Sequence, residues 1–185
     1  SVVAQGAPWA TLAWTLAIAA SSLIVMLTLP ALGAHADLRA SKKRVLMGCT
    51  LACVLGTFAL AGAGPGDLWW AVLAIVVSNV AYSYGESLTA AFLPELARPE
   101  ALGRVSGWGW SFGYLGGMLT LGLSLAYVLA AQQRGEPATS FVPVTMVITA
   151  TVYALASLAT FTLLRERAVP QNKAAQTSTG TGLRA

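Results

Sequence analysis

Five long apolar segments constrain the fold of this 185-residue chain more than any other feature. They span residues 8–33, 45–66, 68–93, 105–133 and 137–164. Together they contain one charged residue, Glu86. A helix that crosses the hydrocarbon core of a bilayer, about 30 Å at 1.5 Å per residue, needs roughly 20 apolar residues. The sequence therefore predicts an all-α, polytopic membrane protein with five transmembrane helices surrounded by the lipid bilayer.

Turn-forming residues set the expected helix boundaries. We place the transmembrane bundle in residues 1–164, with spans at about 8–33, 45–63, 68–93, 105–131 and 140–164. Pro30 and Gly33 are expected to mark the end of the first helix, and the prolines in residues 94–104 to stop the third, because proline cannot continue a helix. Residues 165–185 lose their apolar character and are predicted to form a flexible cytoplasmic tail or a linker between two halves of a protein.

Lysine and arginine are distributed unevenly over the connections between these helices. Ten of the eleven bases follow the first, third and fifth helices, and Arg134 alone follows the fourth. Positive residues in short loops are retained on the cytoplasmic side of a membrane. We therefore predict an outside N-terminus and a cytoplasmic C-terminus. Bases dispersed in this way do not form one extended face, so nucleic-acid binding is not expected.

An outside N-terminus combined with five helices suggests that the chain is a piece of a longer membrane protein. Residues 1–7 contain no base of the kind that opens a signal peptide, and the chain does not start with methionine. We expect that at least one helix precedes it.

Residues typical of enzymes are scarce. His35 is the one histidine, and no metal-ligand cluster surrounds it. Cys49 and Cys53 lie one helical turn apart in an apolar span, where packing between helices explains small side chains better than metal binding does. We predict no enzyme activity, no catalytic residue, no metal and no cofactor.

The third span carries polar residues on one face. They lie at offsets of three, four and seven: Asn79, Tyr82, Ser83 and Glu86. A carboxylate that faces lipid is costly, so this face is expected to look into the bundle or into a water-filled cavity. A substrate or proton pathway is one interpretation. The other is that Glu86 serves packing or lies near the wet interface.

The fourth span is rich in glycine. Gly109, Gly113 and Gly117 recur every four residues and line one stripe, which Gly116 broadens. Small residues allow a neighbouring helix to approach closely in a membrane. Helix packing is the main interpretation, and a surface for sliding or rocking is the alternative.

The connection between the first two spans carries a motif. It combines a glycine, an aspartate four residues later and a basic cluster: Gly33, Asp37, Lys42, Lys43 and Arg44. This pattern resembles the loop between helices 2 and 3 of the major facilitator superfamily, although Ala40 and Ser41 stand where that family has a turn glycine. The resemblance implies a gate whose charge pairs hold one conformation of a transporter. Without Gly33 and Asp37, the bases would be explained by topology alone.

Residues 91–117 resemble a narrower group, the vacuole effluxer branch of the same superfamily. The matching residues are Leu93, Pro94, Arg104, Ser106, Gly107, Gly109, Trp110, Gly113, Tyr114, Gly116 and Gly117. Thr89 and Ala90 depart from the tyrosine and asparagine of that branch.

This resemblance implies that the five spans are helices 2 to 6 of a twelve-helix secondary transporter. A first helix and a second six-helix half would complete it. Such a protein moves a small solute by alternating access, with amino acids as one candidate class and protons as a candidate coupling ion. The alternative is a membrane scaffold that transports nothing. The alanine- and glycine-rich helices would suit a bacterial inner membrane.

Overall fold

The computed structural model describes residue 3 and residues 8–38 and 41–164, with the backbone alone at Asp37. Within this part of the chain, five helices are long and apolar enough to cross a membrane. They are α1 (Ala10–Leu38), α2 (Lys42–Ala61), α3 (Leu68–Leu96), α4 (Leu102–Gln133) and α5 (Ala138–Leu163), with a short 3-10 helix, η1 (Pro99–Ala101), before α4. The predicted fold class, an all-α membrane protein with five spans, is confirmed. The predicted tail, residues 165–185, lies outside the described residues.

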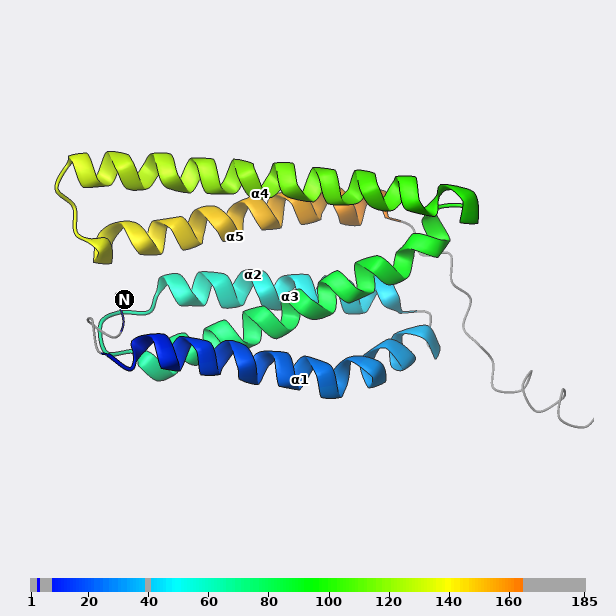
Figure 1. The fold of residues 1–185 in the computed structure, drawn as a ribbon, viewed down its shortest axis with the longest axis horizontal. Helices are drawn as coiled ribbons and strands as arrows, with labels where there is room; N and C mark the ends of the chain where they lie inside the picture. Colours follow the sequence, from blue (N-terminus) through cyan, green and yellow to red (C-terminus); the bar gives the residue numbers. More distant parts are fainter. Residues whose placement is uncertain (1–2, 4–7, 39–40, 165–185) are drawn as a thin grey trace, which may run out of the picture.

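Successive long helices run in opposite directions and lie side by side (Figure 1). We call the end where α1, α3 and α5 finish and α2 and α4 begin the basic end. Its described bases are Lys42, Lys43, Arg44, Arg98 and Arg104. At the opposite end, Arg134 Nε donates a hydrogen bond to Glu136 Oε1 at 2.7 Å, and this bond with its charge raises the pKa of the Arg134 guanidinium.

The turn between α2 and α3 at the opposite end agrees with its glycine- and proline-rich sequence. The φ angle of Gly66 is 96°, in the left-handed region that glycine adopts without steric cost. Asp67 Oδ2 accepts a hydrogen bond from the backbone N–H of Gly64 at 3.0 Å and closes the turn. These residues reverse the chain within a few positions, so α2 and α3 are antiparallel neighbours.

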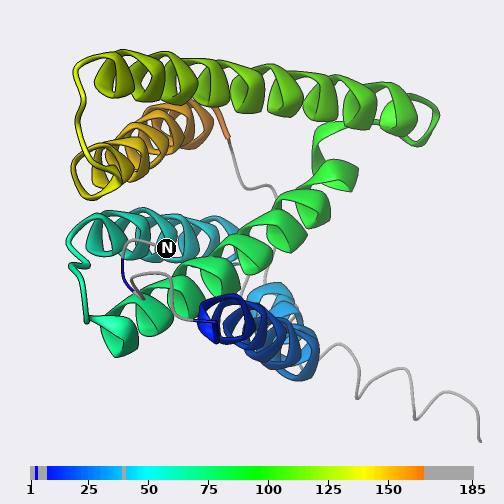
Figure 2. The ribbon, with the colours of Figure 1, turned by 60° about the vertical axis from the view of Figure 1, so that its left-hand side comes forward.

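The helices follow a spatial order that differs from their order in the chain. α3 packs on both α2 and α1, α2 also packs on α5, and α4 lies on α5. Figure 2 shows α4 and α5 as one layer, with α1, α2 and α3 below it. α4 is thus at one edge of the bundle and α1 at the other.

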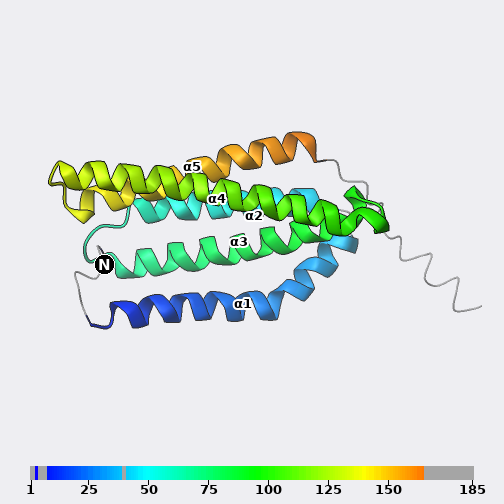
Figure 3. The same ribbon diagram turned by 45° about the horizontal axis from the view of Figure 1, so that its top comes forward.

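Two helices end later than expected, and both contain a proline. α1 passes through Pro30 and ends at Leu38, and α3 passes through Pro94 and ends at Leu96. Proline removes one backbone hydrogen bond and bends a helix, but transmembrane helices tolerate it, and α1 bends in its second half (Figure 3). The expected helix ends, at about residues 33 and 93, therefore lie a few residues too early. Asp37 lies in the last helical turn of α1 and not in a loop.

A cluster of buried hydrophobic side chains lies at the basic end. Ala36 of α1, Leu46 of α2, and Leu88 and Phe92 of α3 form one buried cluster. Phe161 of α5 packs against this cluster. Four helices therefore converge beneath the bases of α2, and their ends are held close together.

Candidate functional site

The predicted polar face of α3 divides into two parts. Asn79 Nδ2 donates a hydrogen bond to Ser21 Oγ of α1 at 2.5 Å, and Ser21 is fully buried. Ser21 Oγ in turn donates to the carbonyl of Ile18 at 2.7 Å. Ser83 Oγ donates to the carbonyl of Asn79 at 2.9 Å, within its own helix. Asn79 therefore joins α3 to α1, and the hydroxyl of Ser83 satisfies a backbone group.

A second polar contact between α1 and α3 was not predicted from the sequence. The hydroxyls of Thr28 and Tyr84 form a hydrogen bond, and Thr28 also donates to the carbonyl of Ile24. A serine and a threonine seven positions apart on α1 thus face α3. The sequence signal was weak because Thr28 and Tyr84 belong to different spans.

Tyr82 and Glu86 form the open part of the polar face. Tyr82 is 50% exposed, Glu86 is exposed, and the two are close enough to interact electrostatically. Within residues 8–38 and 41–164, the Glu86 carboxylate makes no hydrogen bond or ion pair. Glu86 lies one helical turn from Tyr82 toward the basic end, in the interior of a membrane-spanning helix.

A tyrosine from another helix lies beside this open part. A Cβ built on Gly85, the residue before Glu86, would lie 3.9 Å from Tyr153 Oη of α5. Sequence analysis missed Tyr153 because it does not share a helix with Glu86. The available signal was a tyrosine hydroxyl within an apolar span, which needs a polar partner.

The residues of the predicted gate lie at the basic end. Lys42 Nζ forms an ion pair with Glu95 Oε1 of α3 at 3.0 Å, and both side chains are mostly buried. Lys43 Nζ donates to the carbonyl of Leu164, at the end of α5, at 2.6 Å. Arg44 is exposed. Gly33 lies in α1 with open space around it, and the side chain of Asp37 lies outside the described part of the chain.

The glycine stripe of α4 has no close neighbour among the described residues. A Cβ built on Gly109, Gly113, Gly116 or Gly117 would meet no atom within 4 Å. The aromatic rings of this region, which include Trp108 and Trp110, are also exposed. The stripe therefore makes no tight helix contact within the part of the chain that the structure describes.

A tight glycine contact occurs instead at Gly56 of α2. A Cβ built there would lie 3.0 Å from Ser78 Cβ of α3 and 3.4 Å from the carbonyl oxygen of Ala74. The sequence analysis did not single out Gly56, because one glycine without a repeat gives little signal.

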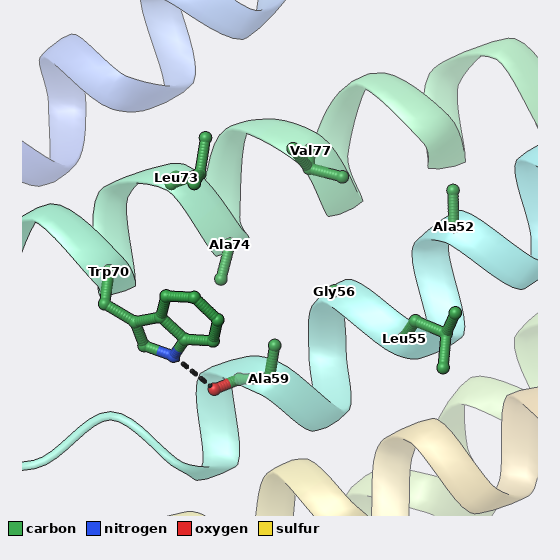
Figure 4. Close-up of a pocket in the computed structure, with 8 residues that line it drawn as sticks. All are labelled: Ala52, Leu55, Gly56, Ala59, Trp70, Leu73, Ala74 and Val77. Atoms are coloured by element: carbon green, nitrogen blue, oxygen red, sulfur yellow. Dashed lines mark hydrogen bonds between the residues drawn. The ribbon is translucent and has the colours of Figure 1, made fainter.

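Beside this contact an apolar groove of about 330 Å³ opens between α2 and α3. It is lined by Ala52, Leu55, Gly56, Ala59, Trp70, Leu73, Ala74 and Val77. The indole N–H of Trp70 donates to the carbonyl of Ala59 at 2.9 Å (Figure 4). The one side-chain hydrogen-bond donor of the groove is thus bound within the protein, so the groove offers no free polar side chain to a polar solute.

The described residues also contain no group of three histidine, cysteine, aspartate or glutamate side chains that would hold a metal ion.

Comparison with known proteins decides the family. The model of the family described as "Vacuole effluxer Atg22 like" matches residues 10–104 and 100–185. The chain belongs to this vacuole effluxer family.

A curated relative of this vacuole effluxer chain agrees with that assignment. It is a protein of Bacillus subtilis (strain 168) named "Uncharacterized MFS-type transporter YxiO", 29% identical over 129 residues. The match covers 69% of the chain and 29% of the relative, so the chain spans less than a third of that relative's length. No solved structure matches. The predicted resemblance is confirmed, and both comparisons point to a transporter of the major facilitator type, which does not favour a scaffold.

Proposed function

We propose that this chain provides five helices of the first half of a secondary active transporter. The complete protein would move a small solute across the membrane by alternating access between two halves. Support comes from the family, from the MFS-type relative, and from the short share of that relative that the chain spans. In this proposal a first helix and a second six-helix half supply the remaining walls of the solute site.

Glu86 is the residue on which the proposal depends. Its carboxylate lies in a membrane-spanning helix, exposed, with no hydrogen bond or ion pair among the residues described. Translocon-based scales put the cost of a charged side chain at the centre of a membrane helix near 3 kcal/mol, so such residues usually face a water-filled cavity or a partner. A carboxylate in that position suits exchange of a proton or contact with a solute cation.

Amino acids are the solute class that we propose. The support is the vacuole effluxer resemblance, together with the chemistry of Glu86, since a carboxylate can bind the ammonium group of an amino acid. Tyr82 would line the same cavity. Asn79 and Ser83 would shape this cavity indirectly, because their side chains form hydrogen bonds with α1 and with the α3 backbone.

A substitution at Glu86 tests this proposal in the full-length protein. Proteoliposomes are loaded with the twenty amino acids, and efflux is measured by chromatography at several pH values. Glu86→Gln keeps the size and removes the titratable group, so we expect normal membrane abundance with efflux lost or independent of pH. Glu136→Gln, a change in the loop at the opposite end, is the matched control and should behave as wild type. Wild-type efflux with a wild-type pH profile in Glu86→Gln would refute the coupling role.

The basic end is proposed as the cytoplasmic gate of this transporter. The Lys42–Glu95 ion pair joins the start of α2 to the end of α3. Charge pairs at the mouth of a bundle change in energy when helices separate. Gly33, Asp37, Lys43 and Arg44 would complete the gate.

The orientation is also a proposal: N-terminus outside and C-terminus cytoplasmic, in a bacterial inner membrane. Single cysteines at Ala40 and Ala138, in a background without Cys49 and Cys53, report it through an impermeant thiol reagent on intact cells. We expect labelling at Ala138 and none at Ala40. The reverse pattern would invert the orientation.

A further inference from the structure

Two hydrogen bonds connect side chains of α1 and α3 inside the membrane-spanning region. Asn79 Nδ2 donates to Ser21 Oγ at 2.5 Å, and the hydroxyls of Thr28 and Tyr84 form the second bond. Ser21 is fully buried, so the first bond lies within the contact between the two helices. α1 packs on α3 far more extensively than on α2. The two bonds therefore belong to the contact that joins α1 to the bundle.

The two bonds hold α3 at different points around its axis. Successive residues of a helix are about 100° apart, so Asn79 and Tyr84, five positions apart, project about 140° from each other. α1 thus binds α3 on both sides of their line of contact. One bond alone would act as a pivot, whereas two bonds separated in this way oppose rotation of α3 about its own axis.

Glu86 lies in the part of α3 whose rotation these bonds fix. It follows Asn79 by seven residues, nearly on the same face, and Tyr84 by two residues, nearly on the opposite face. The other flank of α3 contacts α2, because a Cβ built on Gly85 would lie 3.8 Å from Leu46 Cδ1. Glu86 is exposed between the two contacts. Rotation of α3 by one residue position, about 100°, would turn its carboxylate toward α1 or α2.

Other hydroxyls of α1 show that a bond to α3 is not needed to satisfy a polar group in the membrane. Ser21 and Ser22 donate to the same backbone carbonyl, at 2.7 and 3.0 Å, yet within residues 8–38 and 41–164 only Ser21 also bonds to another helix. Thr15 likewise donates to a carbonyl one turn earlier, at 2.9 Å. Thr28 has such a backbone acceptor too. The bonds of Ser21 and Thr28 to α3 are therefore additional, and they serve the arrangement of the two helices.

We propose that α1 positions Glu86 in the solute site. Its two hydrogen bonds to α3 fix the rotation of that helix, so that the carboxylate stays directed between the contacts with α1 and α2. Ser21 and Thr28 are thus positioning residues, which act through α3 and do not touch the solute. This inference rests on the proposed function, which assigns Glu86 to the solute site.

The first test measures the direction of position 86 without any transport. Glu86→Cys and Gly62→Cys, the latter at the exposed end of α2, introduce two cysteines into full-length protein whose other cysteines are replaced by serine. Both carry nitroxide labels, and pulsed electron paramagnetic resonance gives the distribution of distances between them. Ser21→Ala combined with Thr28→Val should broaden this distribution, because α3 can then rotate.

Matched variants on the same helix keep this test specific. Ser22→Ala combined with Thr15→Val removes two hydroxyls that bond within α1 and should leave the distance distribution unchanged. Thr28→Ser keeps the hydroxyl and should leave it unchanged as well. An unchanged distribution in Ser21→Ala with Thr28→Val would overturn the proposal whether or not the protein transports amino acids. Equal broadening in the control pair would also overturn it.

The second test measures amino-acid efflux from proteoliposomes. Thr28→Val should raise KM about three- to fivefold at normal membrane abundance, because loss of one hydrogen bond between membrane helices lowers the share of protein in which Glu86 is correctly directed. Tyr84→Phe should have the same effect, and the two changes together should add little, because they remove one shared bond. Thr15→Val should keep the wild-type KM. A wild-type KM in Thr28→Val, or fully additive effects, would contradict the positioning role.

Failure of the proposed function would give a different result. Wild-type efflux by Glu86→Gln, beside a broadened distance distribution in Ser21→Ala with Thr28→Val, would refute the proposed role of Glu86 and, with it, the link of α1 to the solute.

Discussion

The α1–α3 pair and α4 differ in whether their small and polar residues contact another described helix. Between α1 and α3, buried Ser21 receives the hydrogen bond of Asn79, and Thr28 meets Tyr84. On α3 and its other neighbour α2, Gly56 brings two backbones close together. On α4, the glycines of the stripe have open space around them, and the tryptophans are exposed.

This difference shows that the structural role of a motif in a membrane helix depends on the helix that packs against it. Small and polar residues stabilise helix association only where another helix is present, because lipid offers them neither close packing nor hydrogen bonds. The following predictions test the contrast between the two regions.

The largest expected effect is at Gly56. Gly56→Ala places a Cβ 3.0 Å from Ser78 Cβ and 3.3 Å from the backbone nitrogen of Ser78, so α2 and α3 must separate. We expect a loss of about 1–3 kcal/mol in the free energy of unfolding. Gly113→Ala meets nothing within 4 Å and should be stabilising by up to about 1 kcal/mol, because it removes a flexible residue from a helix. Unfolding of the chain in mixed micelles, followed by tryptophan fluorescence, measures both.

Equal effects of these two alanine substitutions would contradict the contrast between α2 and α4. In the full-length protein, a Gly113→Ala change that becomes destabilising would indicate that a further helix covers the stripe.

A smaller effect is expected at the bond between α1 and α3. Asn79→Ala removes the donor to Ser21 Oγ and should lower the free energy of unfolding by about 1 kcal/mol, within the range measured for hydrogen bonds between membrane helices. Ser22→Ala is the matched control, because Ser22 is exposed and bonds only to the carbonyl of Ile18 in its own helix. The same unfolding experiment applies. Indistinguishable stabilities of the two variants would show that the Asn79–Ser21 bond does not hold α3 to α1.

The smallest effect is expected at the end of α5. Lys43 donates to the carbonyl of Leu164, and a cation at a helix C-terminus contributes about 0.3–1 kcal/mol. Lys43→Ala should therefore accelerate hydrogen exchange of the amides in the last turn of α5. Arg44→Ala changes an exposed neighbouring residue and should leave the exchange of these amides unchanged. Faster exchange in both variants would attribute the effect to the charge of the basic end as a whole.

The fold was largely predictable, and the candidate site only in part. The apolar segments identified all five helices, and the spacing of Asn79 and Glu86 placed both on α3. The proline at the end of the third span misled, because a membrane helix continues through Pro94 when its remaining backbone groups stay satisfied. The partner of Asn79 is 58 residues away, and no local pattern marks Ser21 as that partner. Tyr153 was missed for the same reason.

Within the described residues, the sequence by itself determined which segments form helices long and apolar enough to cross a membrane. A segment in lipid must satisfy its backbone hydrogen bonds internally, so length and hydropathy suffice to identify a helix. Only the tertiary structure decided which side of each helix meets which neighbour. Lipid tails are as apolar as leucine, so a helix that is apolar all round carries no mark of its inner face. The close approach at Gly56 and the bond of Asn79 to Ser21 became visible only when the helices were placed side by side.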